Sequence, residues 1–169
     1  QVNQTINSLN LDGTISNSAG ASALSVTTTS DIGGNITTAG TQTYTGAVTV
    51  SSDVTLTTTD SNVLFSATIE GSGSAESLTI AAGTGSVTFA NTIGATTALN
   101  MLTVNATGGI YVAGNISTED SLSDGLYYIL INSNTYFADN LTYFNTNTPG
   151  SSGIWPYSTI NVQDNSQII

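Results

Sequence analysis

A hydrophobic pattern with a fixed period runs through the middle of this 169-residue chain. Val54, Leu78 and Leu102 are separated by a constant step of 24 residues, and each is followed two positions later by another apolar residue. A second set keeps the same step and is offset by one residue in its third copy: Val63, Phe65 and Ile69, then Val87, Phe89 and Ile93, then Ile110, Val112 and Ile116.

Within each pair of the first set, the apolar residues lie two apart with a small polar residue between them. This is the period of a β-strand with one buried face, whereas a helix would space them three and four apart. Short strands that recur at a fixed interval, separated by Gly, Ser, Thr and Asn turns, are typical of stacked coils that bury one another's faces. The sequence therefore predicts an all-β protein, a parallel β-solenoid over residues 1–118.

The first third of the chain follows the same pattern less regularly. Leu9, Leu11 and Ile15 repeat the spacing of Val63, Phe65 and Ile69, so we expect an equivalent coil there. Between Ile36 and Val54 the interval doubles from 9 to 18 residues, which indicates an inserted strand or a widened coil.

The charge of the chain is one-sided. It has 11 acidic residues and no Lys, Arg or His, so its formal charge is −11. Such a chain lacks the phosphate-neutralising surface that nucleic acids require, and we expect neither nucleic acid nor an anionic membrane as a partner. It also has no Cys, and no apolar run long enough for a transmembrane helix. This composition favours an extracellular or cell-surface location.

Residues 119–169 differ in composition. Of the one Trp, seven Tyr and four Phe in the chain, eight lie in this segment. We expect it to cap the solenoid or to dock on another subunit, because an open solenoid end exposes unpaired backbone and apolar side chains. Stacking on glycans is the alternative, since aromatic side chains concentrate in binding sites. The candidate interface or glycan contacts are Tyr127, Tyr128, Tyr136, Phe137, Tyr143, Phe144, Trp155 and Tyr157. Asn132-Ser133-Asn134 predicts a hairpin turn before the strand at residues 135–137.

Two kinds of chemistry remain open to the carboxylates. Catalysis would require a carboxylate pair that cleaves glycosides, and the candidates are Glu119 with Asp120 or Asp124, and Glu70 with Glu76. We expect no enzyme activity, because acidic residues in turns are usually only solvated. Glu119, Asp120 and Asp124 are also the best candidates for a calcium site, although the spacing of known calcium loops is missing. We expect no other cofactor.

Two segments resemble a known group of proteins. ITTAGTQTYTGAVTV at residues 36–50 and LTVNATGGI at residues 102–110 are similar to the repeats of large bacterial surface exoproteins of the filamentous-haemagglutinin and autotransporter-like group. The resemblance covers about residues 24 to 118. It implies a right-handed parallel β-helix that is exported and serves adhesion, biofilm cohesion or a surface filament, and it implies no catalytic residues.

The sequence thus predicts an extracellular structural or adhesive β-solenoid that self-associates or stacks within a longer chain, with host or matrix glycans as further partners. Two alternatives remain. One is a carbohydrate-binding or glycan-cleaving β-helix, and the other is a fibre subunit with a strand-complemented β-sandwich, which would show antiparallel ladders.

Overall fold

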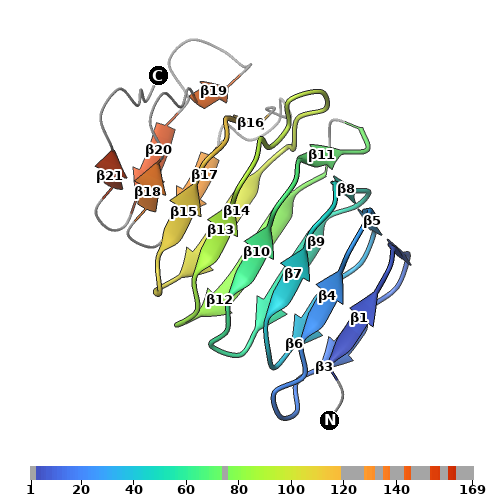
Figure 1. Ribbon diagram of the computed structural model, residues 1–169. Helices are drawn as coiled ribbons and strands as arrows, with labels where there is room; N and C mark the ends of the chain where they lie inside the picture. Colours follow the sequence, from blue (N-terminus) through green and yellow to red (C-terminus); the bar gives the residue numbers. More distant parts are fainter. Residues whose placement is uncertain are drawn as a thin grey trace.

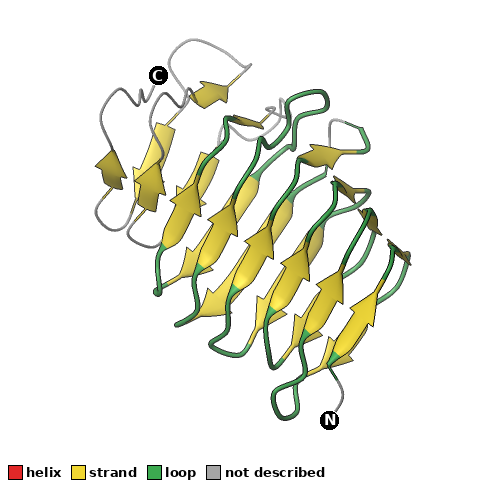
Figure 2. Ribbon diagram, viewed as in Figure 1, coloured by secondary structure: helices red, strands yellow, loops and turns green. Residues whose placement is uncertain are grey.

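The computed structural model describes residues 3–73 and 76–118 with their side chains and, beyond residue 118, the backbone of the five strands given below. All regular structure in these residues is β-strand, and the strand pairs among them are parallel (Figures 1 and 2). The described part contains no helix, and so none that is long and apolar enough to span a membrane. The predicted parallel β-solenoid is confirmed, and the β-sandwich alternative is wrong.

The strands form three sheets, which we call A, B and C. Sheet A consists of β1 (Gln4–Ile6), β4 (Leu24–Val26), β7 (Gln42–Tyr44), β10 (Val63–Phe65), β13 (Val87–Phe89), β15 (Ile110–Val112), β18 (Thr135–Phe137) and β21 (Ile160–Val162). Sheet B consists of β2 (Leu9–Leu11), β5 (Ser30–Ile32), β8 (Val48–Val50) and β11 (Ile69–Gly71), followed by the separate pair β16 (Ile116–Thr118) and β19 (Tyr143–Asn145). Sheet C consists of β3 (Ile15–Asn17), β6 (Ile36–Thr38), β9 (Val54–Thr58), β12 (Leu78–Gly83), β14 (Leu102–Ala106), β17 (Tyr128–Ile131) and β20 (Gly153–Pro156).

The chain passes through the sheets in the order A, B, C and then returns to A one level further along the axis (Figure 1). We call each circuit a coil, so that β1–β3 form coil 1, β4–β6 coil 2, β7–β9 coil 3 and β10–β12 coil 4. In coil 5, between β13 and β14, the sheet B strand is reduced to bridges at Ile93, which pairs with Ile69 on one side and Ile116 on the other.

The register follows the sequence repeat. Leu78 pairs with Val54 on one side and with Leu102 on the other, as the step of 24 predicts. Val87 likewise pairs with Val63 on one side and with Ile110 on the other, although Ile110 comes one residue earlier in the sequence than the constant step predicts. Equivalent apolar residues are therefore stacked directly on one another along the axis, and they form one continuous core.

In the first coil, the structure differs from the equivalence between strands that the sequence predicts. Leu9 and Leu11 lie in sheet B, and Ile15 lies in sheet C, where it pairs with Ile36. Val63 and Phe65, to which they were matched, lie in sheet A, so the expected equivalence is shifted by one sheet. Strands of three residues with inward first and last positions look alike in all three sheets, and spacing alone does not identify the sheet.

The expected insertion between Ile36 and Val54 is likewise wrong. The residues concerned form β7 and β8, which are the ordinary sheet A and sheet B strands of coil 3. Ile36 pairs with Leu56, a step of 20 residues, so the early coils are shorter than the later ones. The doubled interval reflects two sides of a coil and contains no additional strand.

Parallel pairing continues beyond residue 118. Strand β17 pairs with β14 and β20, while β18 pairs with β15 and β21. The hairpin predicted at Asn132-Ser133-Asn134 is therefore wrong, because the strands on either side of it belong to different sheets. That residues 119–169 cap the rod or dock on another subunit stays a prediction.

Aromatic side chains stack in the core beneath sheet A. The ring of Phe65 lies between those of Tyr44 and Phe89, with centroid distances of 5.0 and 5.5 Å and interplanar angles of 10° and 12°. All three side chains are almost fully buried. The in-register ladder places their Cα atoms opposite one another, so the stack is a direct result of the repeat.

The core also contains a polar side chain, Gln42, whose amide group is hydrogen-bonded at both its nitrogen and its oxygen. Gln42 is completely buried, and its Nε2 donates to the backbone oxygens of Thr57 at 2.9 Å and Ile36 at 3.3 Å. Its Oε1 accepts a hydrogen bond of 2.9 Å from the Tyr44 hydroxyl. Burial raises the pKa of the Tyr44 phenol far above its ordinary value, because the phenolate has no water to solvate it.

This shift predicts an alkaline loss of stability. Since the pKa of Tyr44 is raised in the folded state, its contribution is complete below the unfolded pKa of about 10 and is lost as the pH rises above that value. Tyr44→Phe should lower the free energy of unfolding at about pH 8 by roughly 1 kcal/mol, through the lost bond to Gln42, yet reduce the further loss between about pH 8 and pH 11. Urea unfolding at both pH values measures this, and equal losses in the two proteins would contradict it.

Ser30 is a buried polar residue without a partner. It is 2% exposed, it occupies an inward position of sheet B between Leu9 and Val48, and its Oγ makes no hydrogen bond. Ser30→Ala should raise the free energy of unfolding by about 1 kcal/mol, because it removes an unsatisfied hydroxyl. Ser22→Ala is the matched control, since the buried Ser22 hydroxyl donates to Asn17 and Ala19 and its removal should be destabilising. Thermal melting distinguishes these results, and a destabilised Ser30→Ala would count against this account.

Candidate functional site

The predicted calcium and aromatic sites lie mostly beyond the described side chains. Glu119, Asp120, Asp124, Tyr127 and Tyr157 are outside the described residues. The backbone of the remaining aromatic candidates is placed in strands: Tyr128 in β17, Tyr136 and Phe137 in β18, Tyr143 and Phe144 in β19, and Trp155 in β20. The calcium, interface and glycan roles of these residues stay predictions.

Glu70 and Glu76 each stabilise a loop. Glu70 Oε2 accepts hydrogen bonds from the backbone N–H groups of Thr96 and Thr97 at 3.0 and 2.9 Å. Glu76 accepts from the Ser72 hydroxyl at 3.0 Å and the Gly73 N–H at 3.1 Å. Among the described residues, no group of three or more acidic side chains is close enough together to hold a metal ion.

Asn and Asp side chains connect successive coils at the strand starts. Asn3, Asn35, Asp53 and Asn62 each precede a strand directly. The Oδ1 atom of each accepts the backbone N–H of its counterpart in the next coil, at distances of 2.8–3.1 Å: Ala23, Thr55, Ser77 and Ser86. These bonds extend the ladder by one residue, so the Asx residues here stabilise the stack.

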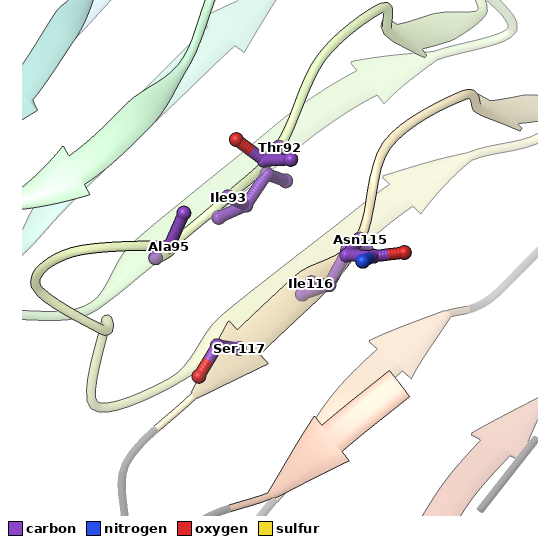
Figure 3. A pocket seen from close by; sticks show the side chains of 7 residues that line it. Thr92, Ile93, Ala95, Asn115, Ile116 and Ser117 are labelled. Carbon is purple, nitrogen blue, oxygen red and sulfur yellow. The ribbon is translucent and has the colours of Figure 1, made fainter. Parts of the chain in front are cut away.

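A shallow groove of about 330 Å³ lies on the sheet B side between coil 5 and β16. Figure 3 shows Thr92 and Ala95 on one wall and Asn115 and Ser117 on the other. Gly94, with φ at +67°, turns the chain away from the regular sheet B path, and the Glu70 carboxylate holds the resulting loop. The groove therefore exists because coil 5 lacks a regular strand in sheet B.

The first coil leaves a set of strand edges open. In β1, the N–H of Gln4 donates to the backbone oxygen of Ala23, and the backbone oxygen of Ile6 accepts from the N–H of Thr27. Gln4 and Ile6 therefore bond toward β4, and the N–H and C=O of Thr5 between them point to the open side. No described strand pairs with the outer sides of β1, β2 or β3. The apolar side chains of this coil, Ile6, Leu9, Leu11 and Ile15, are only partly buried. We call this the open N-terminal edge.

The carboxylates of the described part are distributed unevenly over the three faces. Asp31 and Glu70 point outward from sheet B, since each is the central residue of a strand with buried neighbours. Asp12, Asp53 and Glu76 lie in the turns between sheets B and C, and Asp60 lies in the turn between C and A. In the six strands of sheet A whose side chains are described, the outward residues carry no charge: Thr5, Ser25, Thr43, Leu64, Thr88 and Tyr111.

Comparison with protein-family models, curated proteins and solved structures finds no match for this chain. The fold defines it as a β-solenoid rod, while the resemblance to surface exoproteins remains an expectation.

Sequence reasoning did not find the groove, the open edge or the uneven charge. The groove left no signal in the apolar pattern, because Ile93 is followed two residues later by Ala95, while the regular strands β5, β11 and β16 lack a second large apolar residue at that spacing. The uneven charge distribution can be recognised only after each Asp and Glu has been assigned to a sheet or a turn.

Proposed function

We propose that this protein is an extracellular structural or adhesive element, a β-solenoid rod that extends axially through its open N-terminal edge. The observation that carries the proposal is the uninterrupted parallel ladder, eight strands long in sheet A and seven in sheet C. A stack with open strand edges accepts a further coil with the same hydrogen bonds and hydrophobic contacts that join its own coils. That coil belongs either to a longer polypeptide or to a second subunit.

The composition supports the location. A surface without Lys or Arg offers no site to trypsin-like proteases, and the net charge of −11 keeps such a chain soluble outside the cell. The turns vary in length while the ladder keeps its register, which suits a protein whose purpose is mechanical.

Electron microscopy and small-angle scattering of the full chain test this proposal. We expect elongated particles whose axis lengthens by about 4.8 Å for each coil, and filaments at high concentration if subunits join end to end. Thr5→Pro should abolish the filaments and leave single rods, because it removes an N–H from the open edge and none from the internal ladder. Compact particles would refute the rod, whereas filaments formed equally by Thr5→Pro would refute the role of this edge.

The groove beside Thr92 and Asn115 favours a second candidate, the binding of a neutral glycan. Its volume is near the lower limit for small-ligand sites, and its uncharged walls offer hydroxyl and amide groups. Ala95→Trp should fill the groove and abolish binding of the full chain to neutral oligosaccharides, measured on a glycan array. Thr88→Trp, on sheet A, is the control that should retain binding.

A further inference from the structure

We propose that two copies of this chain pair side by side through the outward face of sheet A. This inference rests on the proposed structural role and adds to it a partner, a second copy, and the face that this partner contacts. The face consists of Thr5, Ser25, Thr43, Leu64, Thr88 and Tyr111, which are in register along the axis.

The charge distribution selects this face. Two chains with a charge of −11 repel one another, and this repulsion is smallest where no carboxylate enters the contact. Five of the six described carboxylates lie on sheet B or in the turns between B and C: Asp12, Asp31, Asp53, Glu70 and Glu76. Sheet A does not take part in the corner between sheets B and C. Pairing through sheet A therefore turns the acidic sides of both rods away from the contact.

The side chains favour sheet A over sheet C, whose outward residues in the described coils are also uncharged. Thr, Ala, Asn and Ser occupy sheet C, such as Thr55, Thr79 and Thr103 in one row. Sheet A presents Leu64, which is half-buried, and Tyr111, which is 44% exposed and is the only large hydrophobic residue among the described side chains that counts as exposed. Aromatic enrichment and depletion of charge are the compositional signs of an interface core.

The face is narrow, so the pairing is expected to be weak for single chains. The six strands that carry this face have three residues each and cover about 29 Å by about 10 Å. The area of about 600 Å² for both partners together is below the range of stable interfaces, so we expect a transient contact with a dissociation constant in the high micromolar range or above. In longer rods the same contact repeats along the axis, so several weak contacts together give a higher overall affinity between the two rods.

Single cysteines provide a direct test, because the chain has no Cys. Thr88→Cys places a thiol on sheet A, Thr103→Cys on sheet C and Thr49→Cys on sheet B. All three residues are half-buried outward threonines, so they form a matched set. Under mild oxidation of the full chain, Thr88→Cys should form disulfide-linked dimers at least about tenfold faster than the other two variants.

Adding Tyr111→Asp to Thr88→Cys should remove this advantage, because it places a carboxylate in the contact directly beside residue 88. Equal rates for the three variants, a faster rate on sheet B or C, or no effect of Tyr111→Asp would each overturn the pairing. Scattering from the cysteine-free chain keeps the two proposals separate. A rod without preferential cross-linking contradicts only the pairing, and compact particles contradict the rod itself.

Discussion

Replacing Gly34 with alanine is expected to destabilise the protein by about 3 kcal/mol or more. A Cβ atom at Gly34 would overlap the backbone oxygen of Gly13 in the coil below. The obstacle is backbone held between two ladders, so no side chain can rotate away to make room. The clash is relieved only if the two coils separate locally.

Gly13→Ala is the matched control for this substitution. Gly13 lies at the same corner one coil earlier, and an added Cβ there meets nothing within 4 Å. We expect its free energy of unfolding to change by less than about 0.5 kcal/mol. Urea unfolding followed by circular dichroism compares the two variants, and similar midpoints would show that the corner accommodates a larger residue.

Phe65→Ala is expected to cost about 3 to 5 kcal/mol. The substitution removes the middle ring of the stack formed with Tyr44 and Phe89, leaving a cavity in the centre of coil 4 and breaking two ring contacts worth roughly 0.5 to 1.5 kcal/mol each. Nothing in the regular stack can collapse into the space without disturbing the register on both sides.

Leu64→Ala serves as the control because Leu64 is the next residue of the same strand and points outward. Its expected cost is about 1 kcal/mol or less, since its side chain is already half exposed. Calorimetry of both variants gives the comparison. A cost for Leu64→Ala as large as that for Phe65→Ala would show that the outward face of the strand contributes as much stabilisation as the buried ring stack.

The sequence was most informative where the repeat is regular. The column through Val54, Leu78 and Leu102 was predictable residue by residue, because a constant interval fixes which residues become neighbours. The coils containing Leu9 and Tyr44 were not, since turns of different length shift the interval without leaving any mark on the strands themselves.

Polar residues resisted prediction for a different reason. Gln42 stands in the sheet A column between Leu24 and Val63, a place where an amide side chain is rarely buried. Its burial is stable only because Thr57, Ile36 and Tyr44 are positioned to complete its hydrogen bonds. Such positions depend on the three-dimensional arrangement of two coils, which the local sequence does not contain.

The carboxylates described above have one general consequence. Five of them accept hydrogen bonds from neighbouring N–H or hydroxyl groups, with Glu70 held by two main-chain amides and Asp53 by one. The amides take the place that basic side chains occupy in most proteins, and with no Lys, Arg or His in the chain there are no side-chain ion pairs for dissolved salt to weaken. Added salt therefore weakens no attractive ion pair and shields only the repulsion between acidic groups, so the free energy of unfolding should stay constant or rise as the salt concentration increases.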